Sequence, residues 1–274
     1  KKIIITATGS NSILPLYHRC NFFLARFAYK RAHAVTAISS FTRNEILKKV
    51  PALSIQVINH GVDADFFART DGSHYDVSRY KPYILGVGQL RWRKGYHFSI
   101  RAFAKVRERF PNLKYVIVGT HYKDDYYMRL QKLIDDLSLR EHVYILEDVD
   151  SKEKLADVYK GAELFCLFSQ NVNHDVEGFG LVFLEAAASG LPVVGSKHCG
   201  VDDAVRDQRN GILVETRSPD DFASALIKIL GDAELQKQMR QESLLFARQS
   251  AWEKKIAEYK KVYQKLLTKQ FLHE

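Results

Sequence analysis

Residues 164–195 read LFCLFSQNVNHDVEGFGLVFLEAAASGLPVVG. The segment begins with a continuous apolar run, Leu164–Phe168, and ends with another, Pro192–Gly195. Between the two runs, a turn with two glycines leads into the helical pattern of Leu181–Ser189. Continuous apolar runs of this length are typical of strands buried on both faces, and a helix between two such strands indicates that they run parallel. The segment therefore predicts a strand–helix–strand unit of a parallel α/β sheet.

The same alternation of short apolar runs and amphipathic helical patterns extends over most of the chain. Further strands are expected at Ile3–Thr6, Ala34–Ile38, Ser54–Ile58, Tyr83–Val87, Lys114–Val118 and Val143–Leu146. Helical patterns cover Tyr17–Arg31, Phe41–Lys49, Tyr96–Arg109, Asp124–Leu137, Lys152–Tyr159 and most of the tail from Pro219 to Leu267. This order predicts the α/β class, with doubly wound parallel sheets.

One segment, residues 63–81, has no sustained period and contains Gly, Ser and Asp. We interpret it as a linker, with a second domain beginning near Tyr83. The domain limits that we predict are residues 1–75, 76–250 and 251–274. The last of these holds one more amphipathic helix, whose apolar face is made of Ile256, Tyr259, Val262, Tyr263 and Leu266.

The composition limits the kind of protein that this chain can be. It has 274 residues, of which 46% are hydrophobic and 27% are charged, which excludes global disorder. No apolar run approaches the roughly 18–20 residues of a membrane-spanning helix. The three cysteines, Cys20, Cys166 and Cys199, have neither the pattern of a disulfide framework nor zinc-ligand spacing. They favour a reducing compartment, and we expect a cytoplasmic protein.

The net charge of +9 is concentrated at the beginning of the chain. Residues 1–50 contain nine Lys and Arg residues but a single acidic residue, Glu45. A basic segment suggests an anionic partner, such as a phospholipid surface or a phosphorylated acceptor. Solvated faces of ordinary helices explain the charge equally well. No nucleic-acid-binding motif accompanies it, so we expect no nucleic-acid partner.

The helical pattern of Tyr17–Arg31 allows two interpretations of this basic segment. The basic residues Arg19, Arg26 and Lys30 lie on one side of the helix. Phe23, Phe27 and Cys20 lie nearer the other. Basic amphipathic helices of this kind lie on anionic membrane surfaces. Packing of the apolar side against a sheet produces the same pattern, and this is the interpretation that we favour.

The glycine turn before the helix carries the first candidate site. EGFGLVFLE covers residues 177–185, so the backbone N–H groups of residues 180–182 lie at the positive end of a helix. Such an end is suited to phosphate or diphosphate groups. Glu185 lies one turn into the helix, where a carboxylate can accept hydrogen bonds from ribose hydroxyls, and Glu177 lies in the turn itself. A tight turn with two ordinary acidic side chains is the alternative interpretation.

A second candidate loop, GQLRWRKG at residues 88–95, follows the expected strand Tyr83–Val87. It places Arg91, Arg93 and Lys94 at the carboxyl end of a strand, where open α/β sheets bind ligands. The forked guanidinium groups and the lysine point charge suit a diphosphate. Taken alone, the loop is better explained as a solvated basic loop. The two loops together favour a nucleotide diphosphate as the ligand.

These motifs resemble the retaining glycosyltransferases of family four, which have the GT-B fold of two facing Rossmann-like domains. The matching segments follow the order of that family and read VINHGVDADFF, YILGVGQLRWRKGYHFSIRAF, LKYVIVG, EGFGLVFLEAAASGLPVV and RNGILVET. AHAVTAISSFTRNEIL resembles the end of the family's N-terminal domain. The resemblance implies a GT-B protein whose N-terminal domain is only partly present, and a final helix that crosses back to that domain. We therefore expect that an upstream part is missing.

The resemblance also implies roles for individual residues. Glu185 would hold the ribose of a nucleotide-sugar donor, Glu177 would face the transferred sugar, and Lys94 would contact the diphosphate. The expected catalytic residues are Glu177, Lys94 and Arg93. The expected donor-binding residues are Glu185 together with Gly61, Gln89, Arg91, Gly178, Phe179, Gly180, Leu181 and Val182. Members of the family usually need no metal and no other cofactor, so we expect none.

The function implied is transfer of a hexosyl group, with retained configuration, from a UDP- or GDP-sugar to a glycan or lipid-linked acceptor. DVEGFG and GVDDAV are similar to segments of mannosyltransferases, which favours GDP-mannose slightly. A lipid-linked acceptor would place the protein at the inner face of a membrane. The anionic surface expected for residues 1–50 agrees with that location.

Three positions depart from the family pattern. Thr8 stands where the family often has a histidine near the donor sugar, Gln89 replaces an arginine, and Cys199 replaces the first of two glycines. These departures leave an alternative, a catalytically inactive module that binds a nucleotide sugar or scaffolds a partner. A GT-B phosphorylase or epimerase is a weaker alternative, because no segment resembles a pyridoxal-phosphate lysine site.

Overall fold

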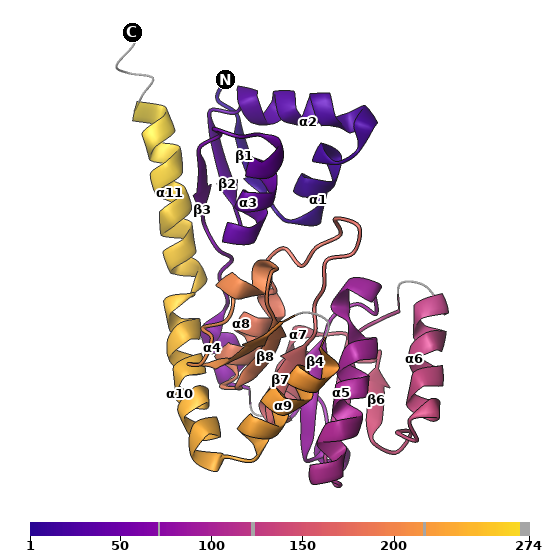
Figure 1. Cartoon of the computed structure of the whole chain (residues 1–274). Coiled ribbons are helices and arrows are strands. Elements are labelled where there is room, and N and C mark those ends of the chain that lie inside the picture. Colours follow the sequence, from indigo (N-terminus) through magenta and orange to yellow (C-terminus); the bar gives the residue numbers. More distant parts are fainter. Residues whose placement is uncertain (71, 122–123, 216–217, 269–274) are drawn as a thin grey trace.

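A computed structural model of the chain describes residues 1–70, 72–121, 124–215 and 218–268. These residues form two parallel sheets, each with helices packed on it, which lie one above the other in Figure 1. We call residues 1–58, which contain the first sheet, the small lobe. Residues 63–250, which contain the second sheet, are the large lobe. The α/β fold with parallel sheets that the sequence predicts is confirmed.

The small lobe has three strands in the order β1-β2-β3, and both strand pairs are parallel. The strands are β1 (Ile4–Ala7), β2 (Ala34–Ala37) and β3 (Ile55–Val57). The connecting helices are α1 (Ser10–Ile13), α2 (Arg19–Arg31) and α3 (Ser40–Lys49). A small apolar core lies between these helices and the sheet.

The large lobe has six parallel strands in the order β6-β5-β4-β7-β8-β9. They are β4 (Tyr83–Val87), β5 (Lys114–Val118), β6 (Val143–Leu146), β7 (Leu164–Leu167), β8 (Val193–Ser196) and β9 (Gly211–Val214). Strands β4, β7, β8 and β9 are buried along their whole length, which explains their continuous apolar sequences. The strands expected from the sequence do not include β9, in which a glycine precedes three apolar residues.

The strand order determines where the loops and helices lie. The chain runs outward from β4 through β5 to β6 and then returns to β7 on the other side of β4. Because crossovers between parallel strands are right-handed, this reversal puts the helices on opposite faces. One face carries α5 (Tyr96–Arg109), α6 (Asp124–Asp136) and α9 (Pro219–Leu230). The other carries α4 (Ala64–Ala68), α7 (Lys152–Gly161), α8 (Leu181–Ala188) and α10 (Ala233–Gln249).

The segment expected as a linker, residues 63–81, is partly helical instead. It contains α4, which Asp63 caps by accepting a backbone hydrogen bond. Phe67 of α4 is 3% exposed, and its ring meets that of Tyr159 edge-on at a centroid distance of 5.7 Å. A five-residue helix is too short to show a helical period, so the sequence pattern misses it. Phe67 therefore anchors α4 to the core of the large lobe.

The expected packing of α2 is also wrong. Phe23, Leu24 and Phe27 are 75%, 71% and 62% exposed, so they do not pack against the sheet. Tyr29 is the buried residue of this helix. Amphipathic periodicity identifies an apolar side but not the surface that covers it, and this explains the error.

The last helix, α11 (Trp252–Thr268), leaves the large lobe and lies alongside the small lobe (Figure 1). Val262 is its buried residue, while Ile256 and Tyr263 of the expected apolar face are exposed. The predicted domain limits stay a prediction. Residue 71 of the expected linker and residues 269–274 of the expected last section lie outside the described residues.

Membrane-spanning segments were sought among the helices of the described ranges. None of these helices is both long enough and apolar enough to cross a bilayer.

Replacing Phe67 with alanine should lower the free energy of unfolding by about 3–5 kcal/mol, because a cavity would replace the buried ring. Phe66→Ala is the matched control, since Phe66 is only partly buried on the same helix and should cost less than about half as much. Denaturant unfolding followed by circular dichroism measures both. Two equally small effects would contradict the packing of α4 on the large lobe.

Candidate functional site

The carboxyl ends of the large sheet face the small lobe across a cavity of about 490 Å³. Both lobes form its walls. The small lobe contributes Thr8, Ser10, Asn11, Leu14 and Ile38. The large lobe contributes Arg91, Arg93 and residues 175–181, and His60 completes the lining. The cavity therefore lies beside the loops that follow β4 and β7, at the point where the strand order reverses.

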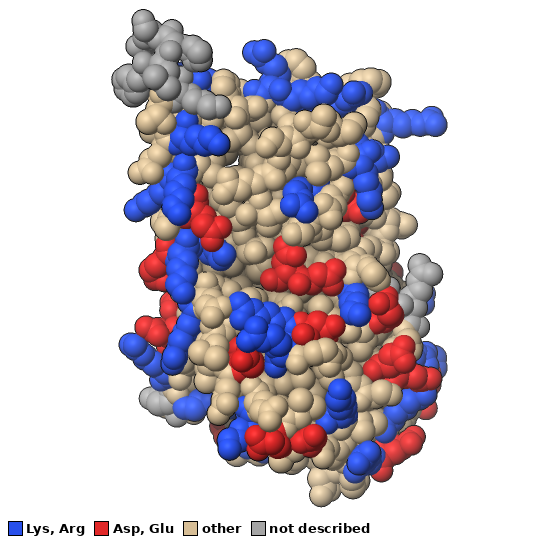
Figure 2. All heavy atoms as spheres, turned by 60° about the vertical axis from the view of Figure 1, so that its left-hand side comes forward, with Lys and Arg blue, Asp and Glu red and all other residues tan. Residues whose placement is uncertain are grey.

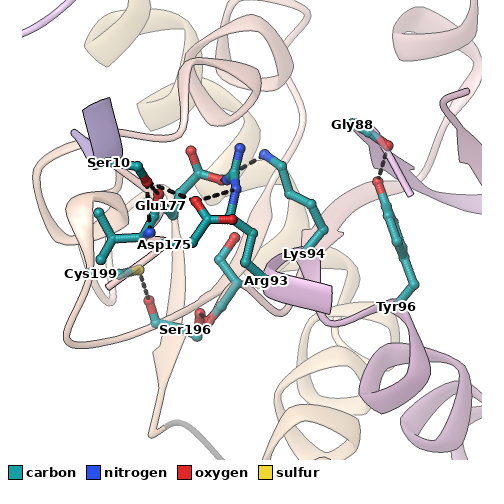
Figure 3. Close-up of polar contacts among 11 residues, drawn as sticks. Ser10, Gly88, Arg93, Lys94, Tyr96, Asp175, Glu177, Ser196 and Cys199 are labelled. Carbon is teal, nitrogen blue, oxygen red and sulfur yellow. Dashed lines mark hydrogen bonds and ion pairs between the residues drawn. The ribbon is translucent and has the colours of Figure 1, made fainter. Parts of the chain in front are cut away.

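The carboxylate of Glu177 is the charged centre of the cavity. Its Oε2 accepts hydrogen bonds from Lys94 Nζ at 2.6 Å and from Arg93 Nη1 at 2.9 Å (Figure 3). Arg93 Nε also lies 3.3 Å from Oδ1 of Asp175. Glu177 and Lys94 are both buried. The three predicted catalytic residues thus form one ion cluster, joined by Asp175.

Two opposing effects act on the pKa of Glu177. Burial alone would raise it, because a charged carboxylate loses its hydration. The positive charges of Lys94 and Arg93 and their hydrogen bonds outweigh burial and hold the pKa of Glu177 below its ordinary value. Glu177 is therefore a carboxylate at neutral pH, and it fixes the side chains of both cations.

The start of α8 forms one wall of the cavity. Gly180 precedes the helix with φ +84°, a left-handed conformation that favours glycine. Within the described chain, no side chain caps this helix end. Gly180 and Leu181 line the cavity, so the N–H groups at the positive end of α8 lie at its wall. An anionic group in the cavity would be stabilised there.

Glycines bring this turn very close to its neighbours. A Cβ atom on Gly200 would lie 2.1 Å from the carbonyl oxygen of Gly178, and one on Gly9 would lie 2.9 Å from the Cα of Gly178. The Gly200 N–H donates to the carbonyl of Glu177 at 2.7 Å. The turn is therefore clamped between β8's loop and the small lobe, which fixes the backbone beside Glu177.

Glu185 lies apart from the ion cluster, on the face of α8 that meets α7. Its Oε2 accepts a hydrogen bond from the hydroxyl of Tyr159 at 3.0 Å. Burial raises the pKa of Glu185, and the Tyr159 hydrogen bond opposes that rise. Glu185 is not among the residues that line the cavity. The two predicted glutamates therefore occupy different surroundings on either side of the start of α8.

The other predicted donor-binding residues divide into two groups. The structure brings one group to the cavity wall, namely Arg91, Gly178, Phe179, Gly180 and Leu181. Gln89 is exposed on the loop after β4, and Val182 is half-buried on α8. Gly61 packs against Trp252, where a Cβ atom would lie 2.7 Å from the Trp252 Cα. Ligand roles for both groups stay predictions.

Hydroxyl groups of the small lobe hold the loop that carries Glu177, and no sequence motif points to them. Ser10 Oγ donates to Asp175 Oδ1 at 2.8 Å and accepts from the Val176 N–H at 2.8 Å (Figure 3). Ser39 Oγ, which caps α3, donates to the carbonyl of Gly178 at 2.6 Å. For the Asp175 side of these contacts, the sequence does offer one signal. Asp175 lies two residues before Glu177, and alternate side chains of an extended segment point to the same side.

Further polar and aromatic contacts join the two lobes. Asp203 Oδ2 of the large lobe accepts from the Ser40 N–H at 2.6 Å and from Asn59 Nδ2 at 3.0 Å. The rings of Tyr17 and His174 stack with centroids 3.6 Å apart. The cavity is thus bounded by direct polar and aromatic contacts between the lobes.

The positions that depart from the family pattern lie close to this site. Thr8 lines the cavity, and its hydroxyl cannot act as a base near neutral pH. Cys199 is buried, and burial raises the pKa of its thiol to about 12. Its Sγ donates to the carbonyl of Ser196 at 3.4 Å. Cys199 is therefore a packing residue of the loop and not a nucleophile.

The arrangement is suited to a polar ligand with an anionic part. Lys94 and Arg93 are balanced by Glu177 and Asp175, and the positive end of α8 adds to the potential at the wall. Across the described ranges, no group of three or more His, Cys, Asp or Glu side chains is placed to hold a metal ion. The expectation that no metal is needed stays a prediction.

Comparison with solved structures identifies the type of fold. The chain superposes on Anabaena HepE in complex with UDP and glucose with a TM-score of 0.81 at 20% identity, covering 97% of this chain and 71% of that one. Sucrose-phosphate synthase from Thermosynechococcus elongatus gives a TM-score of 0.81 at 21% identity, with 97% and 68% covered. The expected GT-B type of α/β fold is confirmed, and most of the chain is one Rossmann-like domain.

Sequence comparison then gives the family. A family model described as glycosyl transferases group 1 matches residues 75–246, which is more than half of the chain. The chain belongs to this family.

Curated relatives are similar over three quarters of the chain. One is the GDP-mannose-dependent alpha-(1-6)-phosphatidylinositol monomannoside mannosyltransferase of Mycolicibacterium smegmatis, 31% identical over 76% of this chain and 57% of its own length. Another is the D-inositol 3-phosphate glycosyltransferase of Corynebacterium jeikeium, 30% identical over 78% of this chain and 52% of its own. The chain therefore spans about half the length of the curated relatives that it matches.

The stabilisation contributed by the Glu177 carboxylate should depend on pH. Because its folded pKa lies below the ordinary value of 4.5, the contribution is complete above that value and is lost as the pH falls through the folded pKa. Glu177→Gln should therefore cost about 3–5 kcal/mol at neutral pH and progressively less in acid. Urea unfolding at a series of pH values measures the difference.

Glu253→Gln is the control for this measurement, since Glu253 is exposed on α11. It should change the free energy of unfolding by less than about 0.5 kcal/mol at every pH. A cost for Glu177→Gln that stays constant from about pH 7 down to about pH 3 would contradict a lowered pKa.

Proposed function

We propose that this chain holds the donor site of a retaining, metal-independent hexosyltransferase of family four that uses a nucleotide-diphosphate sugar. The observation that carries the proposal is the convergence of Lys94 and Arg93 on Glu177 beside the uncapped start of α8. This cluster lies in a cavity between two lobes, which separates a reacting group from bulk water. Membership of the group 1 glycosyl transferases supports it.

In the proposed pose, three features of the large lobe would hold the donor. The diphosphate lies at the N–H groups of Gly180 and Leu181, where the helix end is positive. The ribose hydroxyls bind the Glu185 carboxylate beyond that helix end. The sugar then extends toward Glu177 and the small lobe. In this pose Lys94 lies between the sugar and the diphosphate, on the side where negative charge develops.

The transfer exchanges one bond for another at the anomeric carbon. The bond from this carbon to the diphosphate oxygen breaks, and its electron pair leaves with the diphosphate. A bond from the acceptor hydroxyl oxygen forms on the same face, which retains the configuration, and the hydroxyl proton passes to an oxygen of the leaving diphosphate. Lys94, Arg93 and the helix N–H groups stabilise the charge that develops on this leaving group.

The names of the relatives support particular substrates for this proposal. The mannosyltransferase of M. smegmatis uses GDP-mannose on a phosphatidylinositol mannoside, which supports GDP-mannose as donor and a glycan or lipid-linked acceptor. HepE was solved with UDP and glucose, which keeps a UDP-sugar as the alternative donor. A cytoplasmic protein working at the inner face of a membrane fits a lipid-linked acceptor.

A second candidate is a module that binds the nucleotide sugar without transferring it. Thr8 favours it, because a threonine stands in the cavity wall where a histidine is usual in the family. Turnover separates the two candidates. Release of GDP or UDP from its sugar conjugate, in a protein that also binds the acceptor, excludes the inactive module.

Isothermal titration with UDP, GDP, GDP-mannose and UDP-glucose should show binding of one nucleotide series. Glu185→Ala should weaken that binding at least about tenfold, since it removes the hydrogen-bond acceptor for the ribose. Glu253→Ala, an exposed glutamate on α11, is the matched control and should leave the affinity unchanged. Equal affinity of the wild type and Glu185→Ala would contradict the placement of the ribose.

We also propose that α2 binds an anionic membrane surface. Phe23, Leu24 and Phe27 are exposed together on this helix, and Arg19 and Lys30 are exposed beside them. Figure 2 shows basic side chains gathered along the top of the small lobe, at the end away from the large lobe. Exposed apolar groups flanked by positive charge complement a negatively charged lipid surface.

Co-sedimentation with vesicles should therefore depend on both charge and α2. The chain should bind vesicles of phosphatidylglycerol and phosphatidylcholine more strongly than pure phosphatidylcholine. The double variant Phe23→Ser, Phe27→Ser should bind vesicles at least about tenfold more weakly, because it lacks the two exposed rings that would insert into the lipid. Met128→Ser on α6 is the control, since Met128 is equally exposed but lies in the large lobe. Binding that ignores anionic lipid would refute the proposal.

A further inference from the structure

A second cavity lies directly beside the first. It measures about 380 Å³ and is lined by residues of the loop after β4, by Asp125 and Tyr126 of α6, and by the loop before Glu177. Arg91, Arg93 and Asp175 line both cavities. The ion pair between Arg93 and Asp175 is therefore a wall common to the two. A molecule in the second cavity reaches the Glu177 cluster from the side of α6.

Trp92 is the most prominent side chain of this second cavity. It is 45% exposed, although tryptophan usually buries most of its large apolar surface. Its ring packs on Tyr126 at a centroid distance of 4.8 Å and on His97 at 4.9 Å. The guanidinium of Arg129 lies 5.6 Å from the ring centre. Trp92 is thus held firmly by its neighbours while a large part of the indole stays open.

The two rings that support Trp92, those of His97 and Tyr126, are uncharged near neutral pH. His97 Nδ1 and the Tyr126 hydroxyl are hydrogen-bonded at 2.9 Å. Burial, together with the nearby charge of Arg101, lowers the pKa of His97 to about 4. The Trp92 carbonyl accepts a hydrogen bond from Gln170 Nε2 at 3.2 Å, which ties its backbone to the loop after β7. The indole is therefore preorganised and does not depend on a titrating neighbour.

The second cavity and the predicted ribose site lie on opposite faces of the large sheet. Glu185 is hydrogen-bonded to Tyr159 between α8 and α7, whereas Trp92 packs against Tyr126 of α6. A nucleotide anchored at Glu185 and at the start of α8 extends its base away from Trp92. The second cavity is therefore open to a different molecule, which meets the donor sugar at the Glu177 cluster.

We propose that the second cavity is an acceptor subsite that binds a six-membered polyhydroxylated ring, a hexopyranose or an inositol. This proposal rests on the proposed glycosyltransferase function. The negative face of the indole attracts the polarised C–H groups on one face of such a ring. The carboxylates of Asp125 and Asp175 accept hydrogen bonds from its hydroxyls. An open aromatic face with a few converging polar groups is the lining expected for such a ligand.

The chain contains two tryptophans, so Trp92 can be observed alone. In the Trp252→Phe variant, the indole emission comes from Trp92. Titration with methyl α-D-mannopyranoside or myo-inositol, up to roughly 10 mM, should shift this emission to shorter wavelength as the ring leaves water. UDP or GDP alone should leave the emission unchanged, because the nucleotide binds the other face of the sheet.

Two substitutions make the test specific. Trp92→Ala should weaken sugar binding at least about fivefold, measured by saturation-transfer NMR, whereas Trp92→Phe should keep most of it because an aromatic face remains. Both variants should bind nucleotide within about twofold of the wild type by calorimetry. Nucleotide binding lost in Glu185→Ala but kept in Trp92→Ala separates this proposal from that of the donor site.

Three results would overturn the acceptor subsite. The first is an emission of Trp92 that no sugar shifts. The second is loss of nucleotide affinity in Trp92→Ala equal to that in Glu185→Ala, which would assign the cavity to the donor. The third is equal sugar binding by the wild type and Trp92→Ala, which would place the sugar elsewhere.

Discussion

The negative charge of a buried carboxylate must be compensated by positive charges and hydrogen-bond donors. Several neighbours of Glu177 provide this compensation or fix the backbone beside it. Lys94 and Arg93 supply the charge, and both come from the loop after β4. The backbone beside the carboxylate is fixed by Gly200 and by hydroxyl groups of the small lobe. Removing the carboxylate would leave the buried Lys94 ammonium without its ion-pair partner, which is strongly destabilising. The Glu177 carboxylate therefore joins the loop after β4 to the loop after β7.

The sequence predicts the large sheet well because its strands are continuous apolar runs bounded by clear turns. It also predicts the loops of the site, since glycine turns and basic residues after strands have a direct physical meaning. It does not predict α4, whose five residues show no period, or the exposed side of α2, since a pattern cannot name the partner that covers an apolar face. The contacts of Ser10 and Ser39 join residues far apart in the chain, and isolated serines carry no signal for such pairing.

The residues of the site come from both lobes. One group lies within the large lobe, and the other reaches the site only through contact between the lobes. Lys94, Arg93 and the start of α8 all belong to the large lobe and rest on its fully buried strands. Thr8, Ser10 and Ser39 belong to the small lobe and reach the same loop only while the lobes touch. In the proposed function, the donor would therefore bind a preformed surface of the large lobe, and contact between the lobes would set the geometry around the transferred group.

The two places where the chain passes between the lobes lie side by side. Val62 and Ala251 form a parallel bridge, and the Val62 N–H donates to the carbonyl of Ser250 at 3.0 Å. The two connections are therefore held together at one place and form a single hinge region. We expect a change in the angle between the lobes to turn about this bridge, because both connections are held together there. Such a rotation would return the small-lobe hydroxyls to the same loop each time the lobes meet.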